Sequence, residues 1–245
     1  YITLLSTNTL RSDDGRDAYV QGTEFSLRNK DNSWSLSGNA ARNTMAQGDT
    51  SQHQEGHRWG MILAKTSGQW RGELEHYRES EDYNPNDLGY LAAPNEIVTS
   101  GNLKYGIYTP FGAFNRMWWT FNSRLTHLYA PREYSEISWG AEWSAVTTTF
   151  WYNKFEVEGQ PVNGMDWFAS RLEAIPFETP KWTSAEFFTS TDYRRTVALD
   201  GFIKRRWRPD VPDWNEFFLR LAPRFRFSDK LSADYVWSWQ VRHNE

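Results

Sequence analysis

Residues 214–242 read WNEFFLRLAPRFRFSDKLSADYVWSWQVR, and apolar and polar side chains alternate along both halves of this stretch. Every second position in residues 217–227 is apolar, whereas the positions between them include three arginines. The pattern stops at Ser-Asp-Lys (228–230) and resumes over residues 231–241. Because a period of two residues is typical of a strand with one apolar face, the stretch predicts a β-hairpin.

The same period recurs upstream, most clearly in residues 70–75, 116–125 and 136–144. The sequence contains about fourteen candidate strands, many of about ten residues or more. A tilted strand needs about 9–11 residues to cross a bilayer core, whereas strands of soluble proteins usually have about 5–6. The pattern therefore predicts an antiparallel transmembrane β-barrel of a bacterial outer membrane, which this chain forms alone or as part of a larger barrel.

Composition agrees with two-faced strands. The 245 residues include 14 Trp, 12 Tyr and 15 Phe, yet the mean hydropathy is −0.75, so apolar and polar residues must be finely interleaved. A net charge of −4 argues against a nucleic-acid partner, and the lack of cysteine excludes disulfides, thiolate metal sites and a cysteine nucleophile. Tyr1 already lies in a strand-like segment, so we expect a fragment of a longer parent with its export signal elsewhere.

Loop lengths provide a second test, because outer-membrane barrels pair short periplasmic turns with longer outer loops. The expected connections alternate in the first half: short near 31, long at 46–57, short near 67, long at 80–96 and short near 112. Beyond about residue 175 the alternation fails, which indicates a miscounted strand or an extended inner turn. Since no Pro/Gly/Ser-rich linker divides the chain, we expect one domain over residues 1–245.

A secreted all-β carbohydrate-binding or carbohydrate-active protein is the alternative, because a soluble sandwich also alternates. The polar faces carry rows of full charges, such as Glu73 and Glu75 on one strand and Arg220 and Arg224 on another. Such rows suit bulk water or a wet lumen. The two interpretations differ in whether the aromatic residues form lipid-facing bands or gather along one groove.

Several segments resemble a known family. The matching segments are NPNDLGYL (84–91), PFG (110–112), MDWFASR (165–171), STDYR (190–194), ALDG (198–201) and PRFRFSDK (223–230). In order and spacing, residues 80–245 resemble the barrel region of an uncharacterised outer-membrane family of Bacteroidota. Its members typically carry an N-terminal domain resembling family-nine carbohydrate-binding modules.

The resemblance implies an outer-membrane location and a link to glycan handling. It places no functional residue, however, because the family's Glu-Pro is replaced by Ala169 and Ser170, and the sugar-binding-like domain lies outside this sequence. The role that we expect is a channel, an anchor or a platform for a surface or periplasmic protein partner. Outer-membrane lipid and lipopolysaccharide are the other expected partners.

Three polar segments are candidate sites. Asp87, beside Asn86, could bind calcium in an outer loop, although these residues are also common in turns. His53 and His57 could be metal ligands, but a polar outer loop is the alternative because no third ligand is visible.

The third segment is the basic cluster Lys204, Arg205 and Arg206, followed by Trp207 and Arg208. It could hold lipid phosphates at a membrane interface, or it could be a solvated strand end. The sequence has no Gly-rich phosphate loop, Ser-His-Asp set or zinc-protease helix. We therefore predict no catalytic residue, metal or cofactor, and a protein that is not an enzyme.

Overall fold

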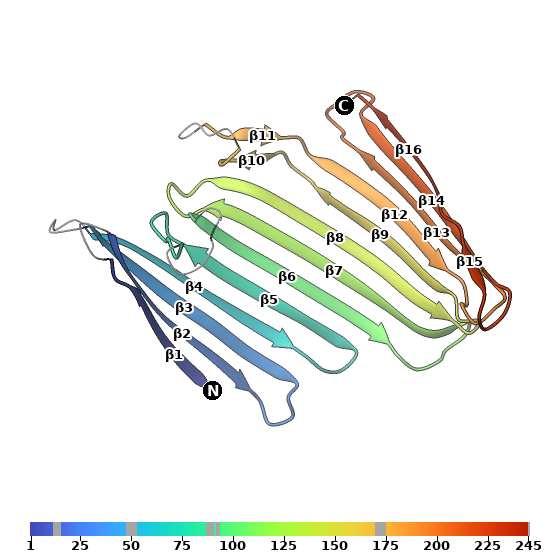
Figure 1. The fold of residues 1–245 in the computed structure, drawn as a ribbon, viewed down its shortest axis with the longest axis horizontal. Coiled ribbons are helices and arrows are strands. Elements are labelled where there is room, and N and C mark those ends of the chain that lie inside the picture. The colour runs from blue at the N-terminus through green and yellow to red at the C-terminus, as the bar shows by residue number, and fades with distance from the viewer. Residues whose placement is uncertain (12–15, 48–52, 87–90, 92–93, 170–174, 245) are drawn as a thin grey trace. The chain divides into compact units, whose positions relative to one another are not determined.

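The computed structural model describes residues 1–11, 16–47, 53–86, 91, 94–169 and 175–244, and all regular secondary structure in these ranges is β-strand. An antiparallel sheet of 14 strands contains all of them except β10 (Gly164–Asp166) and β11 (Phe177–Thr179), which pair with each other (Figure 1). Its strands are β1 (Ile2–Thr9), β2 (Arg16–Arg28), β3 (Trp34–Gln47), β4 (His53–Lys65), β5 (Trp70–Glu79), β6 (Glu96–Ile107), β7 (Phe114–Leu128), β8 (Tyr134–Thr147), β9 (Tyr152–Gln160), β12 (Trp182–Ser190), β13 (Val197–Trp207), β14 (Asn215–Arg226), β15 (Ser232–Asp234) and β16 (Trp237–His243). The predicted number of strands and their antiparallel arrangement are confirmed. Among the described residues no strand pairing closes this sheet into a ring.

The hairpin predicted over residues 214–242 is present, but its second strand is divided into β15 and β16. Both pieces keep one register with β14, since Phe225 faces Ala233 and Leu221 faces Trp237. At the break Tyr235 donates its amide to the carbonyl of Pro223 at 3.0 Å. Proline has no amide hydrogen to return that bond, which explains why the ladder is interrupted there.

The described residues group into two compact units. Unit 1 comprises residues 1–101, 124–136 and 165–177, and unit 2 comprises residues 102–123, 137–164 and 178–245. In a search of the described residues, no helix was found that could span a membrane.

In unit 1, four leucines lie side by side on one face of β2 to β5. The register pairs Leu27 with Leu36, Leu36 with Leu63, and Leu63 with Leu74. Three of them are about half exposed, with Leu74 at 56%. Further along the same face of β3 the residues become polar, because Arg42 forms an ion pair with Glu55. On this face the exposed apolar side chains therefore form a band that covers only part of the length of the strands.

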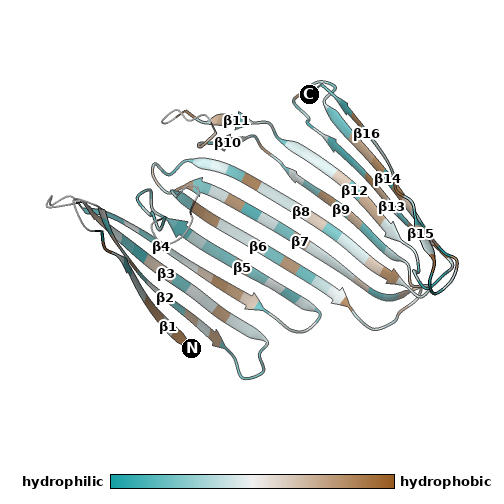
Figure 2. Ribbon diagram, viewed as in Figure 1, coloured by the Kyte–Doolittle hydropathy of each residue, from teal (hydrophilic) through white to brown (hydrophobic). Residues whose placement is uncertain are grey.

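In unit 2, an apolar row crosses six neighbouring strands. Successive register partners in this row are Trp143, Phe155, Phe187, Ile203, Leu219 and Trp239. The residues beside them in each strand point to the opposite face, because side chains alternate along a strand. Figure 2 shows the resulting alternation of hydrophobic and hydrophilic residues along β7 and β8.

The connections between strands alternate as expected near 31, 67, 80–96 and 112, but the long connection expected at 46–57 was wrong, because β3 extends to Gln47 and β4 begins at His53. Within each unit neighbouring strands are antiparallel, so alternate connections lie at the same end of that unit's strands. In unit 1 the connections 29–33 and 66–69 share one end, and in unit 2 the connections 148–151, 191–196 and 227–231 share one end, with four to six residues each. In the order of the strands, the two longest connections, 80–95 and 161–181, alternate with these short ones. The failure that the sequence indicated beyond residue 175 is thus a miscount, because β10 and β11 lie outside the main sheet.

Candidate functional site: a carboxylate–lysine network

One row of charged side chains crosses β8, β9, β12 and β13 on the face of unit 2 opposite the apolar row. The register pairs Glu142 with Glu156, Glu156 with Glu186, and Glu186 with Lys204. Side chains that face each other in this way lie about 5 Å apart at their Cβ atoms. Three carboxylates in succession would repel one another, so their packing requires nearby cations.

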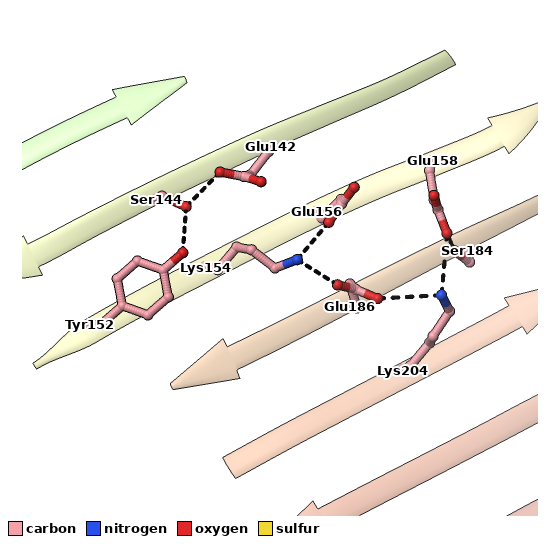
Figure 3. Close-up of polar contacts among 9 residues, drawn as sticks. All are labelled: Glu142, Ser144, Tyr152, Lys154, Glu156, Glu158, Ser184, Glu186 and Lys204. Atoms are coloured by element: carbon pink, nitrogen blue, oxygen red, sulfur yellow. Dashed lines mark hydrogen bonds and ion pairs between the residues drawn. The ribbon is translucent and has the colours of Figure 1, made fainter. Parts of the chain in front are cut away.

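Two lysines supply those cations (Figure 3). The Nζ atom of Lys154 lies 2.7 Å from a carboxylate oxygen of Glu156 and 2.8 Å from one of Glu186. The Nζ atom of Lys204 lies 3.3 Å from the other Glu186 oxygen and 3.2 Å from Glu158. Glu186 therefore bridges both lysines, and its side chain is only 11% exposed. We call these five residues the carboxylate–lysine network.

Buried hydroxyl groups fix the edges of the network. Ser184, which is fully buried, donates to Glu158 at 3.1 Å. On the other side Ser144 donates to Glu142 at 2.7 Å and lies 3.1 Å from the hydroxyl of Tyr152 (Figure 3). Arginines of the neighbouring strands, such as Arg206 and Arg220, share this face with the network, so the site offers hydrogen-bond acceptors and donors and charges of both signs.

The three predicted basic residues do not form one cluster. Lys204 belongs to the network, whereas Arg206 places its guanidinium 4.0 Å from the ring centroid of Trp182. Arg205 points to the opposite face, because it lies between them in the strand and pairs with Phe217 on the apolar side. Because side chains alternate between the two faces of a strand, these basic residues lie on opposite faces although they are consecutive in the sequence.

The predicted metal candidates are not brought together. His53 and His57 lie within β4, so their placement in a loop was wrong. Four steps of about 3.3 Å along the strand separate them by about 13 Å, which is too far for one ion. His57 instead lies 3.3 Å from the hydroxyl of Tyr129, and a search of the described residues found no group of three potential ligands. Asp87 lies outside the described residues.

Sequence reasoning missed Lys154, Glu156, Glu158 and Glu186. Their alternation in the segment KFEVE, residues 154–158, was a usable signal for a charged strand face. The pairing with Glu186 depends on the register between β9 and β12, which are separated by the 161–181 connection.

The turn at 191–196 carries a second polar arrangement. The carboxylate of Asp192 accepts hydrogen bonds from the Arg194 guanidinium at 2.8 Å and from its backbone amide at 3.0 Å. These bonds to the charged form lower the pKa of Asp192 to about 2. The same guanidinium lies 3.9 Å from the ring centroid of Phe150, in the neighbouring turn 148–151.

This turn should make stability depend on pH in the acid range. An unfolded aspartate has a pKa of about 3.9, so the contribution of Asp192 is complete above that value and is lost as the pH falls toward 2. Between pH 5 and pH 2 the melting temperature of the wild type should fall more than that of Asp192→Asn. Equal falls in both proteins would contradict the assignment.

Fold and site together define a class: an all-β protein built on a large antiparallel sheet, with one charged and one apolar face. Over its whole length, residues 1–245, the chain matches the family described as "Domain of unknown function (DUF5916)", and it belongs to that family. Comparisons with curated proteins and with solved structures gave no match.

Proposed function

We propose that this chain is the wall of an outer-membrane β-barrel whose apolar face contacts lipid and whose charged face lines an aqueous lumen. One observation carries the proposal: apolar side chains form continuous, exposed rows on long antiparallel strands. In unit 2, Phe155 is 45% exposed, Ile203 is 40% and Trp239 is 50%, all in the row described above.

Such a row is costly in water. Soluble proteins cover the apolar face of a sheet with a second layer, whereas within each unit no second layer of strands or helices is present among the described residues. Large contiguous apolar patches mark contact with a partner or a membrane. Lipid fits better than a protein partner here, because both units carry such a surface on strands long enough to span a bilayer.

The connections support an orientation. Outer-membrane barrels have short periplasmic turns and longer outer loops. The end with only four- to six-residue connections would then face the periplasm, and the 80–95 and 161–181 connections would face outward. Trp34 and Trp70 lie at the ends of their strands, beside short turns. In this orientation they would lie at the periplasmic interface, where indole groups are favoured.

The charged face suggests the task. A wet face that holds the carboxylate–lysine network suits passage of ions or small solutes, unless the lumen is plugged. An anchoring role, or a role as a platform for a surface or periplasmic protein, is compatible with the same sheet. The assignment to Bacteroidota, and the link to glycan handling, rest on the resemblance of segments such as 84–91 and 165–171.

Membrane fractionation of the full-length protein tests the proposal. We expect it in the outer-membrane fraction, with faster electrophoretic migration before heating than after, as closed barrels show in detergent. A protein that stays in solution without detergent would contradict the proposal and would favour a secreted carbohydrate-binding protein.

A further inference from the structure

A row of five neighbouring aromatic rings crosses the charged face of unit 2, where the alternation would place polar residues. They are Trp118, Tyr152, Phe188, Phe202 and Phe218 from β7, β9, β12, β13 and β14. Phe188 is the register partner of Lys154, and Phe218 is the partner of Lys204. These rings therefore share their face with the carboxylate–lysine network. We call them the aromatic diagonal.

The rings form a continuous track. Trp118 stacks on Tyr152 with centroids 6.2 Å apart, and Tyr152 lies 5.9 Å from Phe188. Phe188 and Phe202 are direct register partners on neighbouring strands, so their Cβ atoms are about 5 Å apart. Phe202 in turn lies 5.7 Å from Phe218. The track thus passes from β7 to β14 without a gap.

Filling a core does not explain this placement. Phe187 and Phe217 are the immediate neighbours of Phe188 and Phe218, and they point to the apolar face. All five rings of the diagonal remain partly exposed. Apolar ring surface is therefore presented on the face that our proposal makes wet.

We propose that the aromatic diagonal and the network together bind a linear oligosaccharide. A sugar ring has apolar C–H faces that pack on aromatic rings, and hydroxyls at its edge that need donors and acceptors. The Phe188–Lys154 and Phe218–Lys204 pairs place both kinds of group in the same rows. Further donors lie beside the rings, because Arg220 is the register partner of Phe202 and Lys104 places its Nζ atom 5.1 Å from the ring centroid of Trp118.

This inference names a class of solute for the proposed function. It rests on that function only because it requires the charged face to be in contact with water. Binding is measured by calorimetry on the full-length protein in detergent, with maltohexaose and cellohexaose as probes. We expect at least one probe to bind. Phe188→Leu and Phe202→Leu, which keep an apolar side chain without a ring, should each weaken binding about threefold to tenfold, as expected for one ring contact.

Phe187→Leu and Phe217→Leu are matched controls on the opposite face, and they should leave the affinity unchanged. Failure of both probes to bind the wild type at millimolar concentration would overturn the inference, as would an equal loss in the controls. Electrophoresis of the same samples with and without heating separates the two proposals. A heat-dependent shift without sugar binding would keep the barrel and reject the oligosaccharide.

Discussion

Leu221→Arg should lower the stability of the membrane-inserted protein by about 2–4 kcal/mol, which is the effect of arginine on the lipid face near the bilayer midplane. Leu221 lies in the middle of β14, 38% exposed, with Gly201 and Trp237 as its register partners. In water the same change at a half-exposed position would cost about 0.5 kcal/mol or less. The size of the effect therefore reports which medium this face contacts.

Ala222→Arg is the matched control, because Ala222 is the next residue and points to the charged face opposite Asp200. We expect a change of about 0.5 kcal/mol or less there. Urea unfolding of the protein refolded into lipid vesicles measures both variants. Similar losses at Leu221 and Ala222 would show that the two faces do not differ in environment.

Glu186→Ala should destabilise the protein by about 1–3 kcal/mol, since it leaves two partly buried lysines without their shared carboxylate. Lys154 would keep Glu156, and Lys204 would keep Glu158, so the loss should stay below that of an isolated buried ion pair. The same unfolding measurement applies.

The control for Glu186 is Glu142→Ala, two strands away in the same row. Glu142 accepts one hydrogen bond from Ser144, so we expect a loss of at most about 1 kcal/mol. If Glu142→Ala and Glu186→Ala were equally harmful, the bridging role of Glu186 would be wrong.

The two-residue period was sufficient to predict the strands and their two faces. It indicated the turn at 228–230 and the apolar positions from Phe217 to Val241, and the structure places both accordingly. The period did not predict the break between β15 and β16. That break depends on which residue lies opposite Pro223 in the ladder, and the period does not determine this pairing.

The sequence alone could not predict which residues pair between strands that are far apart in the chain. The contact of Lys154 with Glu186 requires a register set across the 161–181 connection. A one-residue slip would move every side chain of a strand to the other face, so period alone fixes neither the network nor the aromatic diagonal. The separation of Arg205 from Lys204 and Arg206, in contrast, follows from alternation along one strand and could have been predicted from the sequence.

A spin-label scan across residues 217–222 tests most directly whether the apolar face contacts lipid. The chain has no cysteine, so single cysteines can be introduced and labelled without removing others. In lipid vesicles, labels at 217, 219 and 221 should be accessible to oxygen dissolved in the bilayer, and labels at 218, 220 and 222 to a water-soluble nickel chelate. Equal access of the nickel chelate to all six positions would contradict the membrane assignment.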